Sequence, residues 1–223
     1  MEELDYWKKN KLLLTKHGVY KQSFEHDNCG VGLVAAIDGV PKRSVVDAGI
    51  TALKAVWHRG AVDADGKTGD GAGIQISYPQ NFFKNYIRSL GITPSKNNLA
   101  VGMIFLPKNN ISGQEICRTI VEKEILRSGN KIYCWRSVPV NLNAIGKKAN
   151  ETRPEIEQIF FENTKNIPEQ DFEKTLFFVR RRIEKQIPID SNKDFYICSL
   201  SSKSIVYKGM FLAEQLDTFY PDL

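Results

Sequence analysis

Cys29 stands at the front of an apolar, glycine-punctuated run, Asn28-Cys29-Gly30-Val31-Gly32. A thiol is a strong nucleophile only as a thiolate, and a free cysteine, with a pKa of about 8.5, is only slightly ionised at neutral pH. If the chain is cut after Asn28, the new α-amine of Cys29, with a typical pKa of about 7.7 to 8.0, can act as the base. One residue would then supply both nucleophile and proton acceptor. Composition alone favours an inert buried thiol, because free cysteine is among the most buried residue types.

Two glycine motifs invite a phosphate-binding interpretation. Gly30-Val31-Gly32-Leu33-Val34-Ala35 satisfies a relaxed dinucleotide fingerprint, but polar residues precede it where that motif requires a hydrophobic strand. Gly69-Asp70-Gly71-Ala72-Gly73 lacks the Gly-Lys-Ser/Thr ending of a P-loop. We therefore expect neither run to bind a nucleotide, and we expect the second to form a tight turn.

The remaining reactive side chains do not suggest a metal or disulfide site. The cysteines have no C-x-x-C spacing, no two histidines have metal-ligand spacing, and no catalytic triad with histidine is apparent. The aspartates between residues 63 and 70 do not match an EF-hand. We expect no metal and a reducing compartment. The residues concerned are Cys29, Cys117, Cys134 and Cys198, with His17, His26 and His58.

The composition is that of an ordinary soluble globular protein. Of the 223 residues, 42% are hydrophobic and 26% are charged. No apolar run approaches the roughly 20 residues that span a bilayer, and Leu12-Leu13-Leu14 is too short for a signal peptide. The formal net charge of +5 is spread along the chain, and its densest block, Arg180-Arg181-Arg182, lies in a helix-like segment. We expect a cytoplasmic protein that binds neither nucleic acid nor membrane.

Residues 1–28 differ from the rest of the chain because they are polar and rich in lysine. They are interpreted either as a leader that is removed or as an ordinary N-terminal helix that docks on the domain. The prediction is a leader over residues 1–28 and a domain over residues 29–223.

The first half of the domain predicts strand, helix, glycine-rich loop, strand. The apolar run from Cys29 to Ile37 is expected to be a buried strand, and Asp38-Gly39 a turn. Ser44 is expected to cap a helix that continues through Trp57. Arg59-Gly60 follows this helix. The Arg59 cation can meet the terminal carbonyls of the helix and cap it, or it can form a pocket wall beside the nucleophile. Spacing alone favours the capping role.

The second half predicts further alternation of helices and strands. Hairpin-like and helix-separated strands together favour an α+β fold over a repeating parallel one. Ser112 and Glu115 occupy capping-box positions of one expected helix, and Ser201-Ser202-Lys203 is the turn of an expected hairpin. The expected strands are 74–78, 99–106, 131–138, 156–162, 195–200 and 204–207, and the expected helices are 81–90, 112–128 and 169–186.

Several separated motifs together resemble the glutamine amidotransferase domain of the glutamate synthase large subunit. They are Asn28-Cys29-Gly30-Val31-Gly32, Trp57-His58-Arg59-Gly60-Ala61, Thr68-Gly69-Asp70-Gly71-Ala72-Gly73, Val206-Tyr207-Lys208-Gly209-Met210 and Phe219-Tyr220-Pro221-Asp222-Leu223. The resemblance implies an N-terminal-nucleophile fold, an αββα four-layer sandwich, in which a short propeptide is removed to expose Cys29.

The resemblance also implies a reaction and a site. Cys29 would attack the side-chain amide of glutamine, ammonia would leave, and water would release glutamate from a thioester. Gly30, Arg59, Gly60 and Asp70 would line or support the pocket. In the whole family enzyme, ammonia reaches 2-oxoglutarate at an FMN site served by an iron–sulfur cluster, in the remainder of the large subunit and with a small subunit. No cofactor is expected in this chain.

The family places a glutamine-holding arginine, an Asn-Gly pair for the oxyanion hole and a substrate-binding aspartate after the segment that matches residues 219–223. The sequence stops before them, so we expect Cys29 alone to be a poor catalyst. The alternative interpretation is a non-catalytic remnant that serves as an interaction module or as half of a split enzyme.

Overall fold

The computed structural model describes residues 2–18, 21, 30–56, 60–95, 99–165, 167–188 and 194–223. The chain divides into two compact units, Met1–Val31 and Gly32–Leu223. Helix α1 (Glu2–His17) belongs to the first unit, and Tyr6, Trp7 and Leu12 to Leu14 on it are exposed. The second unit contains all the other helices and strands that the structure describes.

A four-stranded antiparallel sheet forms the centre of the second unit. Its order is β3 (Asn130–Ser137), β4 (Glu155–Asn163), β2 (Leu99–Leu106), β5 (Tyr196–Ser201). Gly102, in the middle of β2, pairs with Ile159 and Leu200, and a Cβ at this position would lie 2.8 Å and 3.0 Å from their side chains. The four strands are those that the sequence predicts, and their antiparallel pairing confirms an α+β fold.

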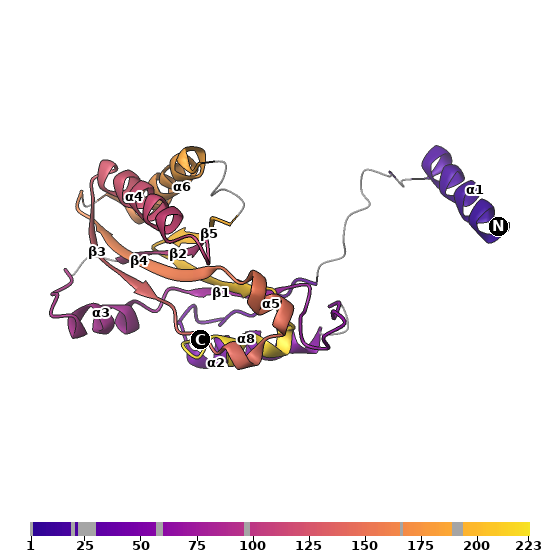
Figure 1. Ribbon diagram of the computed structural model, residues 1–223, viewed down its shortest axis with the longest axis horizontal. Coiled ribbons are helices and arrows are strands. Elements are labelled where there is room, and N and C mark those ends of the chain that lie inside the picture. Colours follow the sequence, from indigo (N-terminus) through magenta and orange to yellow (C-terminus); the bar gives the residue numbers. More distant parts are fainter. Residues whose placement is uncertain are drawn as a thin grey trace. The chain divides into compact units, whose positions relative to one another are not determined.

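Two long helices, α4 (Ile111–Arg127) and α6 (Glu169–Gln186), lie side by side on one face of this sheet (Figure 1). Each presents a helical stripe of buried apolar side chains to the sheet, because such residues recur every three or four positions. The stripes are Cys117, Val121 and Ile125 on α4, and Phe172, Leu176, Val179 and Ile183 on α6. Helix α4 begins after Asn110, whose side chain accepts a hydrogen bond from the amide of Gly113, so the expected Ser112 and Glu115 capping box is wrong.

The opposite face of the sheet packs into a second core. Helix α3 (Gln80–Ser89) places Phe83 against Phe160 of β4, with ring centroids 4.9 Å apart. A two-stranded antiparallel sheet, β1 (Ala72–Ser77) with β6 (Ser204–Gly209), and helix α2 (Arg43–Ala55) contribute to the same core. The short elements of this unit, which the sequence did not predict, are η3 (Leu142–Ala144), α5 (Lys147–Thr152), η4 (Ala213–Gln215) and α8 (Leu216–Phe219).

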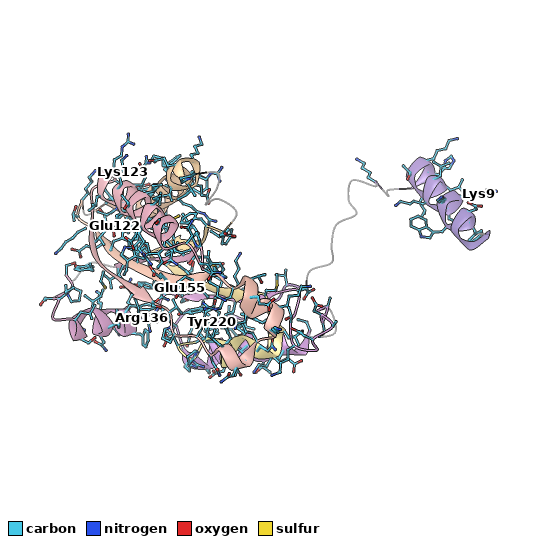
Figure 2. The ribbon with its side chains drawn as sticks, viewed as in Figure 1. Lys9, Glu122, Lys123, Arg136, Glu155 and Tyr220 are labelled. Carbon is cyan, nitrogen blue, oxygen red and sulfur yellow. The ribbon has the colours of Figure 1, made fainter. Side chains whose placement is uncertain are left out.

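A buried cation ties the end of the chain to the sheet. Figure 2 shows Arg136 on the side of the sheet where α3 lies, and Glu122 and Lys123 on α4 at the other side. The Arg136 guanidinium donates to Gln158 at 2.9 Å and to the Asp222 carboxylate, and it lies 5.0 Å from the Tyr86 ring centroid. The segment that follows α8 is therefore fixed within the fold.

Three further expectations about local structure are wrong. Residues 30–37 form no strand; Leu33 is 91% exposed, and no described strand pairs with them, although a strand needs such a partner for its backbone groups. β6 follows β5 through the expected tight turn but pairs with β1. Helix α2 begins after Lys42, so Ser44 lies inside it, and Trp57 lies outside the described residues. The expected turn does form, since the Gly39 amide donates to the Ala36 carbonyl at 3.0 Å.

Candidate functional site

A compact hairpin spans the residues from Gly60 to Asp70. Val62 and Gly69 form an antiparallel bridge, and the Asp63 amide donates to the Thr68 carbonyl at 2.8 Å. At its open end the Asp70 amide donates to the Ala61 carbonyl at 3.1 Å. The hairpin therefore brings Asp70 beside the Gly60-Ala61 segment, and two of the predicted site residues lie together.

The tip of the hairpin is closed by Asp65. Its carboxylate accepts hydrogen bonds from the Thr68 hydroxyl at 2.6 Å and from the amides of Thr68 and Lys67 at 2.7 Å and 2.9 Å. These donors, with the Thr68 hydroxyl first, hold the pKa of Asp65 well below its usual range. The carboxylate therefore stays ionised and locks the turn.

The hairpin is also clamped to the start of α5. The buried Thr68 hydroxyl accepts a hydrogen bond from the amide of Ala149 at 3.3 Å, and Lys148 forms an ion pair with Asp63. Gly146 allows this approach, because a Cβ there would lie 2.3 Å from the Thr68 hydroxyl oxygen. Asp65, Thr68 and Lys148 are structural residues that sequence reasoning did not single out as a clamp.

The glycines after the hairpin serve close packing. A Cβ on Gly69 would lie 2.6 Å from both the Leu212 nitrogen and the Phe211 carbonyl carbon, and a Cβ on Gly73 would lie 2.6 Å from Cβ of Lys208. Gly71 has a backbone φ of +131°, which residues with a side chain rarely adopt. Residues 69–73 run from the hairpin bridge through a bend into β1, so the tight turn expected within this run does not form, and the glycines permit close packing instead.

The other predicted site residues are placed less fully. Cys29 and Arg59 lie outside the described residues, as does His58, and Gly30 belongs to the first unit, where it is exposed and irregular. Asp70 is exposed, and its carboxylate has no hydrogen bond or ion pair with any residue that the structure describes. It is therefore available to a ligand.

The three described cysteines are poor nucleophiles. Cys117 and Cys198 are buried and Cys134 is half-buried. Burial raises the pKa of each thiol, that of Cys198 to about 11. The Cys198 thiol also donates to the Val206 carbonyl at 3.4 Å. At neutral pH these thiols remain protonated, which leaves Cys29 as the candidate nucleophile.

Two surface hollows have linings that include none of Gly30, Gly60 and Asp70. One, of about 460 Å³, is lined by Asp63, Ala64, Asp65, Lys147, Lys148 and Glu151 at the hairpin tip. In the described part of the chain, no group of three or more histidine, cysteine or acidic side chains could hold a metal ion. Among the same residues, none of the helices has the length and apolar character needed to cross a membrane.

Comparison with known proteins places the sequence in a family. The family model of class-II glutamine amidotransferases matches residues 29–223. The large chain of an NADPH glutamate synthase from Azospirillum brasilense is 60% identical over 96% of this chain and 14% of its own length. A ferredoxin-dependent glutamate synthase from Arabidopsis thaliana is 39% identical over 89% of this chain and 12% of its own. The large chain of the Bacillus subtilis NADPH glutamate synthase is 36% identical over 92% of this chain and 13% of its own length.

The chain thus spans only 12–14% of the length of these relatives. The matched region begins at Cys29 and contains the whole hairpin with Gly60 and Asp70. Because the family model covers most of the sequence, the chain belongs to the class-II glutamine amidotransferases.

Proposed function

We propose that this chain is the glutamine-hydrolysing part of a glutamate synthase, with Cys29 as nucleophile. The observation that carries the proposal is that the family match begins at residue 29, the cysteine that the sequence singles out. The relatives that support it are glutamate synthases of both the NADPH and the ferredoxin-dependent kind.

The proposed reaction uses both the α-amine and the thiol of Cys29. The free α-amine accepts the thiol proton, and the thiolate attacks the side-chain carbonyl carbon of glutamine. The C–N bond of the amide breaks, the α-ammonium returns the proton to the leaving nitrogen, and ammonia departs. Water then attacks the γ-glutamyl thioester, so that glutamate leaves and the thiol is regenerated. No redox step is needed.

This chemistry requires that residues 1–28 are removed, because a peptide-bonded nitrogen at Cys29 is not a base. The division of the chain into units at Val31 and Gly32, close to the proposed cut, supports a separate leader. The finer fold that we propose is the αββα sandwich of N-terminal nucleophile enzymes. Packing of α4 and α6 outside the four-stranded sheet, with a second sheet at its other face, supports it.

We assign the pocket wall to Gly30, Arg59, Gly60 and Asp70. The hairpin clamp supports this for the last two, since it holds the Asp70 carboxylate exposed and unpaired, among the described residues, beside Gly60. A carboxylate on a backbone segment held in this way can bind the α-ammonium of an amino-acid substrate.

The wider reaction belongs to the longer polypeptide. There, ammonia would be transferred to 2-oxoglutarate with FMN and an iron–sulfur cluster, in the remainder of the large subunit and its small subunit in the cytoplasm. The residues that the structure describes do not fit such a cluster, since no group of three metal-ligating side chains gathers among them. No step proposed for this chain passes through either cofactor.

The test is covalent labelling with a diazoketone analogue of glutamine, read by mass spectrometry of the intact protein and its peptides. Chains 29–223 and 1–223 are compared, each with its Cys29→Ser variant. We expect one adduct, on Cys29, in 29–223 only. The raised pKa values of Cys117, Cys134 and Cys198 make them internal controls that stay unlabelled.

Two results would overturn the proposal. One is equal labelling of the 29–223 chain and its Cys29→Ser variant. The other is no adduct on Cys29 in a folded 29–223 chain, which would favour the non-catalytic interaction module.

A further inference from the structure

The outer face of α6 carries aromatic side chains on the side away from the sheet. Phe177 and Phe178, at the middle of the helix, are 58% and 59% exposed, with ring centroids 5.8 Å apart. Neither belongs to a described hydrophobic core. Helix α6 already buries a complete apolar stripe against the sheet, so these two rings are not needed for its packing.

Basic side chains accompany the rings on the same face. Three exposed basic residues lie at helical spacing from the rings. Lys174 and Arg181 are three or four residues away from them, and Lys185 is one turn beyond Arg181. Together with Phe177 and Phe178 they form a stripe that we call the α6 outer stripe. Its members are Lys174, Phe177, Phe178, Arg181 and Lys185.

Carboxylates are confined to the margins of this stripe. Asp171 pairs with Lys174 at 3.0 Å, and Glu184 pairs with Arg181. Lys185 has no ion pair with any residue in the described part of the chain. The centre of the stripe is therefore basic and aromatic, and aromatic side chains and arginine are enriched at protein interfaces.

We propose that the α6 outer stripe is a docking surface for an amphipathic helix of another protein segment, one that carries apolar side chains along one face and carboxylates beside them. Phe177 and Phe178 would insert between its apolar side chains, and Lys174, Arg181 and Lys185 would face its carboxylates. The relatives' lengths agree with this, since about six sevenths of each relative lies outside the matched region and could supply such a segment.

The charges argue against two other occupants. In an antiparallel pair of α6 helices from two copies, centred on the rings, Lys174 would face Arg181, which is unfavourable. A lipid surface would require a wider apolar face than two rings and fewer marginal carboxylates than Asp171 and Glu184. An acidic protein helix matches both the charge and the narrow apolar strip.

The test measures binding of a fluorescent synthetic amphipathic helix with leucines along one face and glutamates elsewhere. A matched peptide with lysines in place of the glutamates is the charge control. The proteins are the full 223-residue chain, its Phe177→Ser/Phe178→Ser variant, and Ile111→Ser as a control that removes an apolar side chain, 77% exposed, from the start of α4. Because the replaced rings are exposed, melting temperatures should be unchanged, which checks folding.

We expect the acidic peptide to bind at least about tenfold more tightly than the lysine peptide, and the double variant to lose about tenfold or more of that affinity. Ile111→Ser should bind as the wild type does. The proposal is overturned if the wild type does not bind the acidic peptide, if both peptides bind equally, or if the double variant binds as the wild type does. It is also overturned if the stripe instead mediates dimerisation in sedimentation velocity or binding to phosphatidylserine-containing vesicles.

Discussion

Replacing Gly69 by alanine tests the packing that fixes the site hairpin. The added Cβ would lie 2.6 Å from the Leu212 nitrogen and 2.6 Å from the Phe211 carbonyl carbon. Both are backbone atoms, so no side-chain rotation can relieve the contact. The hairpin must therefore move away from residues 211–212, or those residues must shift within a core that includes the buried Phe211.

The cost follows from the kind of contact. Overpacking of a well-packed region costs about 1–3 kcal/mol, and a backbone-to-backbone contact belongs at the upper end, near 3 kcal/mol. For a chain of this size each kcal/mol lowers the melting temperature by about 2–4 °C, so we expect a decrease of about 6–12 °C. A domain stable by about 5–15 kcal/mol still folds.

The assay is thermal unfolding followed by circular dichroism, with Gly32→Ala as the matched control. A Cβ on Gly32 would meet no atom within 4 Å, so this variant should melt within about 1 °C of the wild type. If Gly69→Ala also melts with the wild type, then Gly69 does not pack against residues 211–212 and the position assigned to the hairpin is wrong.

Three further predictions test other contacts. Glu173→Ala removes a carboxylate that accepts from the Ser202 amide and hydroxyl at 2.7 Å and from the Ser201 hydroxyl at 2.9 Å, and should lower the urea unfolding free energy by about 2 kcal/mol. Glu169→Ala, which loses an exposed ion pair with Lys203 and a carboxylate in the first turn of α6, should cost about 1 kcal/mol or less, and equal effects would contradict the assignment. Thr68→Val should cost about 1–2 kcal/mol, because it leaves the Ala149 amide without its acceptor, whereas Thr68→Ser should not; equal urea midpoints for the two would refute the clamp. A hydrogen bond from Gln186, with Arg127 and Arg182, holds the pKa of Glu124 below its ordinary value of 4.5, so the stabilisation from this carboxylate is complete above that pH and is lost as the pH falls through the folded-state pKa. The stability difference between wild type and Glu124→Gln should therefore be largest near neutral pH and shrink below about pH 4.5, and a difference that grows on acidification would be inconsistent with it.

Local patterns predicted the elements that local forces determine. The strand from Leu99 to Leu106 and the helix from Glu169 to Gln186 have the predicted boundaries, because an apolar run and a helical apolar period mark them. The run from Gly30 to Ile37 is as apolar as β2, yet it is exposed and unpaired with the described strands. Apolar composition alone therefore fixes neither burial nor strand pairing, because both depend on contacts with segments distant in the sequence.

In the site, too, local contacts could be predicted from the sequence and long-range contacts could not. The motifs indicated Gly60 and Asp70, and the hairpin brings them together through local hydrogen bonds. The clamp between Thr68 and Ala149 joins residues far apart in sequence, and α5 itself was not predicted, so this support could not be found from spacing. Pairing of β6 with β1, rather than with its sequence neighbour β5, has the same cause.

The most direct test concerns the two reactive atoms of one residue. The 29–223 chain is compared with the same chain carrying one extra glycine before Cys29, which keeps the thiol and moves the α-amine one residue away. We expect the diazoketone to label Cys29 of the first chain and the added glycine to abolish the adduct, with both chains folded. Equal labelling of the two would show that the α-amine of Cys29 is not the base.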